Sequence, residues 1–178
     1  IKIKDNLKNK FVIGYLGTLG LSQGLDFILR SIKQLDIENI HFLIIGEGAQ
    51  KKNLVKLSKE LKLNNITFID SVQRNYLPQY YQLIDISLVC LRKSDLFKTV
   101  IPSKIFESCA MQKPILLGVE GESKELIEKY KAGLAFLPED SYDFKNKIKY
   151  FFNKDKYKIY QKGCKSLALD YRRDKLAK

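Results

Sequence analysis

The sequence predicts an α/β fold, a doubly wound Rossmann-like parallel sheet of about six strands with helices on both faces. Strand-like and helix-like segments alternate along the chain from residue 11 onward. The strand-like segments are apolar throughout, which is typical of strands buried on both faces of a parallel sheet. Glycine-rich turns follow the first two of these segments, at the sheet edge where such folds bind ligands.

The expected elements follow one another in a regular order. Strands are expected at residues 11–17, 41–46, 66–69, 86–91, 114–118 and 134–137. Helices are expected at residues 22–35, 50–63, 77–83, 103–111 and 123–130, with two more between residue 142 and the end of the chain. The first helix has the clearest pattern, because Leu25, Ile28 and Ile32 repeat on one face.

The chain is long enough for one domain with a substantial core, since it has 178 residues of which 45% are hydrophobic. Residues 1–10 are polar and are expected to lead in from a preceding domain, with residues 11–178 forming the domain itself. No apolar run of about 18 residues is present, so no membrane-spanning helix is expected. We expect a cytoplasmic protein, peripheral at most on the inner face of the cytoplasmic membrane.

Cysteine and histidine form no metal-binding pattern. The three cysteines, Cys90, Cys109 and Cys164, lack metal-type spacing, and His41 is the only histidine. We therefore expect neither a metal nor a cofactor, and we expect Cys90 to be a small core residue.

The net charge of +12 is concentrated near the C-terminus. From residue 145 to 178 there are 12 Lys and Arg against 3 Asp, a balance of +9. Such a basic segment, rich in aromatic side chains, either contacts an anionic membrane surface or forms solvated helix faces. Nucleic acid is not expected as a partner, because no nucleic-acid-binding module accompanies the charge.

The segment 100–107 contains the most specific pattern. Pro102 and Ser103 favour a helix start, and Ser103, Lys104 and Glu107 would then share one face of that helix. The free amides and the lysine suit a diphosphate, and the carboxylate suits a pair of sugar hydroxyls. This combination indicates a nucleotide-sugar pocket. The alternative is a capped surface helix with a Lys–Glu pair.

The glycine-rich turns are less specific on their own. The turn at residues 17–24 is neither a GxGxxG dinucleotide motif nor a P-loop, so a nicotinamide cofactor is disfavoured. A second turn, Gly46-Glu47-Gly48, allows a tight connection from strand to helix. A third segment at residues 70–73 could offer backbone groups to a base.

Taken in order, several motifs resemble the C-terminal, nucleotide-sugar-binding domain of group 1 glycosyltransferases of the GT-B fold. The motifs are Gly14-Tyr15-Leu16-Gly17-Thr18-Leu19, Gln23-Gly24-Leu25-Asp26, Ile44-Ile45-Gly46-Glu47-Gly48, Asn65-Ile66-Thr67-Phe68, and residues 80–85 and 102–115. The segment 171–177 is similar to the last helix of that family. Together the motifs cover the chain from about residue 11 to its C-terminus, and their order makes the resemblance specific.

The resemblance implies roles in binding the sugar donor. Glu107 would bind the ribose hydroxyls of the nucleotide, and the main chain of Val72 or Gln73 would contact the base. The amides of residues 103–105 would face the diphosphate, and Gly17 would let the first loop approach it. The expected donor-binding set is Gly17, Thr18, Gln23, Gly46, Val72, Gln73, Lys93, Ser103, Lys104, Ile105 and Glu107.

Three positions depart from the family pattern. Thr18 and Gln23 are uncharged where the family often has arginine and lysine for the diphosphate. Thr99 stands where the family has the first glutamate of a spaced pair, which leaves the contact to the transferred sugar unassigned. Lys104 or basic residues of the loop 92–98 could replace the lost cations. Similar substitutions occur in bacterial surface-polysaccharide transferases.

The function implied is that of a retaining glycosyltransferase, of hexosyl or N-acetylhexosaminyl type, in lipopolysaccharide or capsule biosynthesis. It would move a sugar from a nucleotide diphosphate sugar, UDP-linked, to a saccharide or lipid-linked acceptor without a metal. Part of the catalytic machinery is expected in an N-terminal domain, so this fragment alone is expected to be inactive. Half of a sugar-nucleotide epimerase and a non-catalytic nucleotide-binding module are the alternatives.

Overall fold

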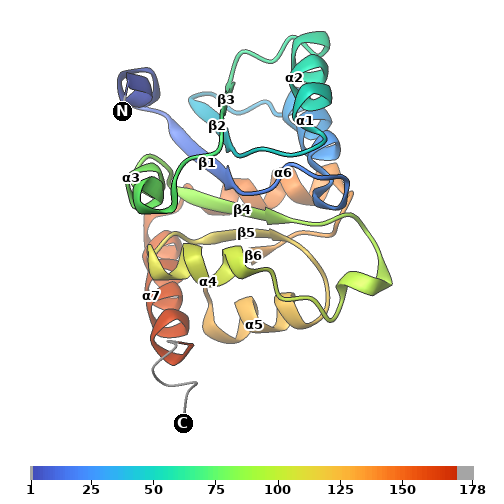
Figure 1. Ribbon diagram of the computed structural model, residues 1–178. Helices are drawn as coiled ribbons and strands as arrows, with labels where there is room; N and C mark the ends of the chain where they lie inside the picture. Colours follow the sequence, from blue (N-terminus) through green and yellow to red (C-terminus); the bar gives the residue numbers. More distant parts are fainter. Residues whose placement is uncertain (1, 172–178) are drawn as a thin grey trace. The chain divides into compact units, whose positions relative to one another are not determined.

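The computed structural model describes residues 2–171 and confirms the predicted fold class (Figure 1). Six strands form one sheet in the order β3-β2-β1-β4-β5-β6, and every described strand pairing is parallel. The chain divides into two compact units, Ile1–Leu88 and Val89–Lys178, with the boundary inside β4 (Ile86–Cys90). We describe each unit by itself.

The first unit contains three strands and the start of β4. The strands are β1 (Phe11–Leu16), β2 (Ile40–Ile45) and β3 (Ile66–Ile69), and the α-helices are α1 (Leu25–Lys33), α2 (Lys51–Glu60) and α3 (Leu77–Tyr81). Short 3-10 helices cover Lys2–Leu7 (η1), Leu21–Gln23 (η2) and Arg74–Tyr76 (η3). All six residues of β2 are buried, as expected for a strand with neighbours on both sides.

The segment expected to be a polar lead-in is partly folded onto the first unit. Residues 2–7 form η1, and Leu7 is buried in an apolar cluster with Val12, Leu16 and Leu43. Ile3 packs against the same cluster. The apolar residues Ile3 and Leu7 explain why part of this segment packs on the fold although most of its residues are charged or amide-bearing.

The second unit contains the end of β4, two further strands and four α-helices. The strands are β5 (Ile115–Gly118) and β6 (Gly133–Ala135), and the helices are α4 (Ser103–Ala110), α5 (Glu122–Tyr130), α6 (Ser141–Tyr150) and α7 (Lys154–Asp170). A 3-10 helix, η4, covers Asp95–Phe97. Within residues 2–171, no helix combines the length and the apolar character needed to cross a membrane.

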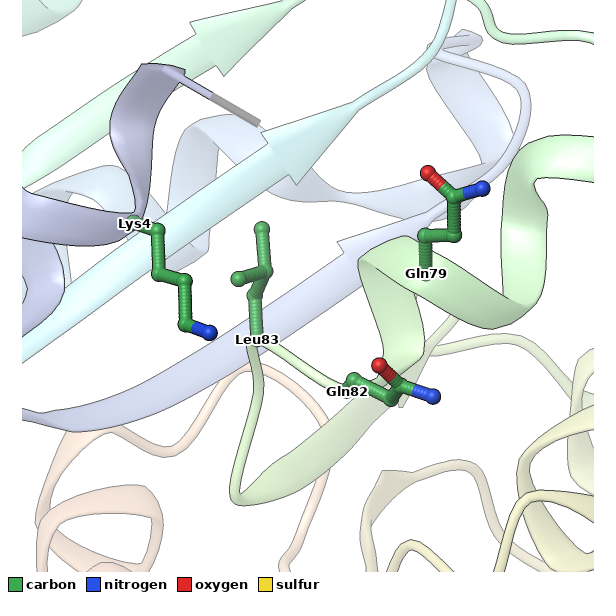
Figure 2. A pocket seen from close by; sticks show the side chains of 4 residues that line it. All are labelled: Lys4, Gln79, Gln82 and Leu83. Atoms are coloured by element: carbon green, nitrogen blue, oxygen red, sulfur yellow. The ribbon is translucent and has the colours of Figure 1, made fainter.

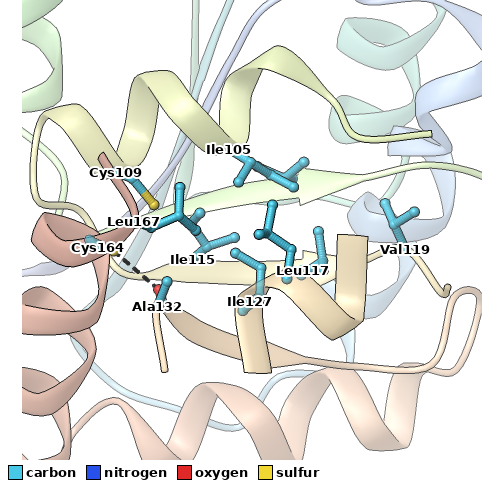
Figure 3. Close-up of a cluster of buried hydrophobic side chains, with 11 residues drawn as sticks. Ile105, Cys109, Ile115, Leu117, Val119, Ile127, Ala132, Cys164 and Leu167 are labelled. Atoms are coloured by element: carbon cyan, nitrogen blue, oxygen red, sulfur yellow. Dashed lines mark hydrogen bonds between the residues drawn. The ribbon is translucent and has the colours of Figure 1, made fainter. Parts of the chain in front are cut away.

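The core of the second unit lies between α4, α5, α7 and strand β5. Figure 3 shows Ile105 and Cys109 of α4 facing Ile115 and Leu117 of β5, with Leu167 of α7 beside them. The helices α4 and α7 pack directly on each other. Because α4 carries most of the predicted diphosphate-facing residues, this core fixes the backbone of that part of the candidate site.

The three cysteines are buried and free, as expected from their spacing. The thiol of Cys164 donates to the carbonyl oxygens of Ala132 (3.2 Å) and Lys113 (3.3 Å). Contact with Cys109, together with burial, raises the pKa of the Cys164 thiol far above its ordinary value, so both cysteines act as small core residues.

The predicted start of the first helix was wrong. The helix expected at residues 22–35 is divided by Gly24, which has a left-handed φ of 62° and separates η2 from α1. The helix expected at residues 103–111 begins at Ser103 as predicted, with Pro102 at the N-cap position. Proline has no side chain that can accept a hydrogen bond, so the first turn of α4 has no side-chain cap.

His41 makes the stability of the first unit depend on pH. Its side chain is 5% exposed, and its Nε2 lies 2.9 Å from the hydroxyl oxygen of Thr67 while Nδ1 has no partner. Burial, aided by the charge of Lys10, lowers the pKa of His41 from 6.5 to about 4.

As the pH falls, His41 is therefore protonated in the unfolded chain at a higher pH than in the folded chain. We expect the free energy of unfolding to fall between pH 6.5 and pH 4, by at most about 3 kcal/mol, and to be unaffected by this group above pH 6.5. Urea denaturation at pH 7.5 and 4.5 measures the change. In a His41→Gln variant this part of the pH dependence should disappear, and an unchanged pH profile would contradict the assignment.

Candidate functional site

The first loop of the first unit, residues 17–24, is held by main-chain hydrogen bonds to the turn after β2. Gly17 N–H donates to the carbonyl of Ile45 (2.9 Å), and Leu19 N–H donates to that of Glu47 (2.8 Å). The carbonyl of Leu19 in turn accepts from Gln50 (2.9 Å). The loop 17–24 and the turn 46–48, which are far apart in sequence, are therefore joined by main-chain hydrogen bonds.

Gly46 is required where these two loops meet. Its φ is +154°, and a Cβ at this position would lie 1.8 Å from the carbonyl oxygen of Gly17. Gly48 has the same φ, and its Cβ would lie 2.4 Å from the carbonyl oxygen of Leu19. The glycines of the predicted motif thus serve the contact between loops.

Thr18 and Gln23 lie in the first loop, where the family often has cations. Thr18 is exposed, and its carbonyl accepts a hydrogen bond from the hydroxyl of Tyr15 (2.7 Å). The side-chain oxygen of Gln23 accepts from the amide of Gly20 (3.0 Å). Gln23 therefore stabilises the loop from within, a role that the sequence did not indicate.

The third loop of the first unit contains the residues predicted to contact a base. Val72 is half-buried and packs against the cluster that contains Leu16 and Ile45, whereas Gln73 is exposed. The carbonyl of Gln73 accepts from the amide of Tyr76 (2.9 Å) at the start of η3. The side chain of Val72 thus packs against the core, and the main-chain contact of Val72 or Gln73 with a base stays a prediction.

Lys51, at the start of α2, connects the second turn with this third loop. Its ammonium lies 2.5 Å from the carboxylate of Glu47 and also pairs with Asp70. The hydrogen bonds that Lys51 donates to Asp70 and Glu47 raise the pKa of Lys51, and Lys51 lowers the pKa of Asp70. Sequence reasoning missed Lys51, because nothing local distinguishes it from the other lysines of its helix.

In the second unit, the predicted residues lie along the first turns of α4. Ser103 and Glu107 are exposed and Lys104 is half-buried, so polar groups of this helix face solvent. Ile105 differs, since its side chain is fully buried and its amide donates to the carbonyl of Pro102 (3.0 Å). Ile105 therefore anchors the helix in the core, and its amide already has a partner.

Tyr171, the last described residue, packs against α4. The ring of Phe106 lies 5.2 Å from that of Tyr171, which also contacts Tyr130 at 6.2 Å. Tyr130 donates a hydrogen bond to Asp170 (2.8 Å), which raises the pKa of Tyr130. Through the Phe106–Tyr171 contact, the last described residues pack on α4, the helix that carries Glu107. The remainder of the predicted segment 171–177 lies outside the described residues.

The loop between β4 and α4, residues 91–102, is attached to the start of α5. The carbonyl of Lys98 accepts from the amide of Glu122 (2.8 Å), and that of Val100 accepts from the hydroxyl of Ser123 (2.5 Å). Gly121 permits this contact, because its φ is +69° and a Cβ there would lie 2.1 Å from the Lys98 carbonyl oxygen. Ser123 and Gly121 are further residues that sequence reasoning did not find.

The basic residues of this loop have different partners. Lys93 is exposed. Arg92 lies 3.7 Å from Glu139, and Lys98 lies 2.7 Å from Asp95. The hydrogen bond that Lys98 donates to Asp95 raises the pKa of Lys98 and lowers the pKa of Asp95. Thr99, which stands in place of the expected glutamate, is exposed in the same loop.

A pocket of the first unit lies away from these positions. A pocket of about 440 Å³ is lined by Lys4 of η1 and by Gln79, Gln82 and Leu83 at and after α3 (Figure 2). None of its lining residues belongs to the predicted donor-binding set. Within residues 2–171 no group of three or more His, Cys, Asp and Glu residues could bind a metal ion.

The structure and the comparisons with known proteins define the class of this chain. A doubly wound parallel sheet with its glycine turns at the carboxyl ends of the strands is an architecture that binds nucleotides. The chain belongs to the glycosyl transferases group 1 family, whose model matches residues 1–164. It is therefore a glycosyltransferase domain, as the ordered motifs predicted.

Relatives and solved structures agree with this family. The chain is 32% identical over 97 residues to WcaI of Escherichia coli (strain K12), which is named as a glycosyl transferase of colanic acid biosynthesis, and the match covers 54% of this chain and 24% of WcaI. It is 28% identical over 138 residues to WbjE of Pseudomonas aeruginosa, a probable glycosyltransferase, covering 75% of this chain and 34% of WbjE. The chain thus spans about a quarter to a third of the curated relatives it matches.

The same fold occurs in Anabaena HepE, solved in complex with UDP-glucose. The TM-score is 0.81 at 20% identity, and the match covers 99% of this chain and 48% of HepE. At this identity the likeness establishes the fold, and the fold does not by itself determine the substrate.

Proposed function

We propose that this chain is the donor-binding domain of a retaining glycosyltransferase that uses a UDP-linked sugar. The observation that carries the proposal is the start of α4, where an uncapped first turn, Lys104 and Glu107 stand within five residues of one another. The positive end of a helix and a lysine favour a diphosphate, and an exposed carboxylate one turn further favours two ribose hydroxyls. The UDP and UDP-glucose complexes of HepE support a uridine nucleotide.

The remaining predicted residues have matching proposed roles. The first loop, with Gly17 and Thr18, approaches the phosphates and the sugar, and Gly46 positions that loop from the second turn. Val72 and Gln73 present main-chain groups to the base, and Lys93 supplies a positive charge from the loop after β4. In the transition state the leaving diphosphate is stabilised by helix amides and lysine side chains.

Catalysis needs more than this chain. We propose that the acceptor, a saccharide or a lipid-linked saccharide, is bound by a part of the enzyme that precedes these residues, and that this chain alone binds donor without transferring it. The coverage of the curated relatives supports this division, since the matched segments span at most 34% of the two proteins compared.

Calorimetric titration with a panel of nucleotides tests the proposal. UDP, GDP, ADP, one UDP-sugar and a short DNA duplex are titrated into the chain. Binding of UDP and the UDP-sugar, with no binding of DNA, is the expected result. If no nucleoside diphosphate binds, the start of α4 is an ordinary surface helix and the proposed function is wrong. Turnover of a UDP-sugar by this chain alone would instead refute the proposal that the chain binds the donor without transferring the sugar.

We further propose that the enzyme acts peripherally at an anionic membrane surface, contacted by the basic C-terminal helices. On α7, four exposed lysines recur at intervals of three or four residues, which places them on one face: Lys154, Lys158, Lys162 and Lys165. Exposed Ile159 (48%) and Leu169 (43%) lie on the same helix. Lysines near an anionic surface contribute about 1 kcal/mol each, and apolar side chains add to the binding.

Liposome co-sedimentation measures this contact. Replacing Lys158, Lys162 and Lys165 by glutamine is expected to weaken binding to vesicles that contain phosphatidylglycerol by about tenfold or more, with no change for neutral vesicles. The control replaces three exposed lysines of α2 by glutamine: Lys52, Lys56 and Lys59. The proposal would be wrong if both triple variants lost the same affinity for anionic vesicles, or if the wild-type chain bound neutral vesicles equally well. The α7 lysines would then only form a solvated helix face.

A further inference from the structure

We infer that Lys51 is a positioning residue that fixes the loop 70–73 relative to the turn at residues 46–48, and so aligns the base-contacting and phosphate-facing parts of the first unit. The inference rests on the proposed function only for the identity of the ligand. Its structural part concerns Glu47, Lys51 and Asp70, all of which belong to the first unit.

The first step of the argument is the position of the Lys51 ammonium. It contacts Glu47 four residues earlier, at 2.5 Å, and Asp70 nineteen residues later in the chain. The Lys51 side chain is only 18% exposed, whereas the carboxylates of Glu47 and Asp70 are 51% and 87% exposed. The lysine is thus the inner member of the group, and its ammonium contacts both acidic side chains.

The second step is the double role of Glu47. Its carbonyl oxygen accepts from the amide of Leu19 in the first loop (2.8 Å), while its carboxylate accepts from Lys51. A continuous series of polar contacts therefore runs from the first loop through Glu47 and Lys51 to Asp70. Asp70 is the first residue of the loop that contains Val72 and Gln73.

The third step concerns the attachment of the loop 70–73 itself. Its start is held by the Lys51–Asp70 pair, its middle by the packing of Val72, and its end by the hydrogen bond from Tyr76 to Gln73. Removing the ammonium leaves two carboxylates facing each other without a cation between them. The start of the loop is then expected to move away from the turn.

Amide hydrogen exchange of residues 70–73 tests the positioning without any ligand. We expect Lys51→Met to speed exchange in this segment by about two- to fivefold, because ion pairs of partly exposed groups contribute modestly to local stability. The matched control is Lys56→Met, since Lys56 is also on α2 and pairs with Glu60 at i+4 (3.8 Å). Unchanged exchange in Lys51→Met, or the same change in Lys56→Met, would overturn the inference.

Ligand titration then separates positioning from a general structural defect. In Lys51→Met, UDP is expected to bind about two- to fivefold more weakly while inorganic pyrophosphate binds as in the wild type. The paired exchange Lys51→Glu with Asp70→Lys restores an ion pair of reversed polarity and should recover most of the UDP affinity. If wild type binds no nucleotide, the proposed function fails, whereas hydrogen exchange still decides whether Lys51 positions the loop.

Discussion

Replacing Glu107 by glutamine is expected to weaken binding of the preferred nucleoside diphosphate by about tenfold or more. The carboxylate is exposed on α4, one turn from the start of the helix, and the substitution keeps its shape while removing its charge. Hydrogen bonds to a charged group contribute roughly 1.5–3 kcal/mol each, and two ribose hydroxyls would lose that assistance together. Calorimetric titration of UDP and uridine measures the loss, which both ligands should show.

Lys104→Ala serves as the complementary variant on the same helix. It should weaken UDP but leave uridine nearly unchanged, because only the diphosphate carries the charge that the ammonium neutralises. Glu125→Gln, an exposed carboxylate on α5, is the control and should bind both ligands as the wild type does. If Glu107→Gln and Lys104→Ala both retain wild-type affinity for UDP, the donor site lies elsewhere.

The strands could be predicted from sequence because their apolar runs are local signals. The expected strand at residues 66–69 coincides with β3, and those at 114–118 and 86–91 differ from β5 and β4 by a single residue at one end. The prediction of a helix at residues 22–35 was less accurate. Gly24 adopts a left-handed φ that interrupts the helix, and the regular apolar pattern of the segment gives no sign of it. Local patterns thus determined the fold class but not the exact element ends.

The candidate site could be predicted only in part, for a physical reason. The start of α4 is encoded within eight residues, so Lys104 and Glu107 could be proposed as site residues from their local spacing. Lys51 acts through Asp70, nineteen residues away, and Ser123 through Val100, twenty-three residues away. Such contacts depend on how parallel strands bring their following loops to one edge, which no local pattern encodes.

One of the two uncharged positions of the first loop, Gln23, is explained by its side-chain contact, whereas Thr18 contributes only its carbonyl oxygen. Gln23 bonds the amide of Gly20, and the carbonyl of Thr18 accepts from Tyr15, so the loop is shaped by neutral hydrogen bonds. Under the proposed function, the positive charge for a diphosphate is supplied by Lys104 and Lys93. Weak dependence of UDP affinity on Thr18 and strong dependence on Lys104 would agree with this division.

The largest expected effect on stability belongs to Gly46, which joins the two glycine turns. An alanine there would place its Cβ 1.8 Å from the carbonyl oxygen of Gly17 and would need a φ of +154°. Both the backbone of the first loop and the turn after β2 would have to move. We expect Gly46→Ala to lower the free energy of unfolding by about 2–4 kcal/mol, as measured by urea denaturation.

Gly20→Ala is the matched control within the same assembly. Its φ is −105°, which any residue adopts, and the added Cβ would meet only the side-chain end of Gln23 at 2.7 Å, which can rotate away. A loss below about 1 kcal/mol is expected there. Because Gly46 also sets the position of Gly17, UDP titration of folded Gly46→Ala at low temperature should show weakened binding as well. Wild-type stability and affinity in Gly46→Ala would mean that the two loops do not need the close backbone approach, and that the first loop is positioned by its hydrogen bonds alone.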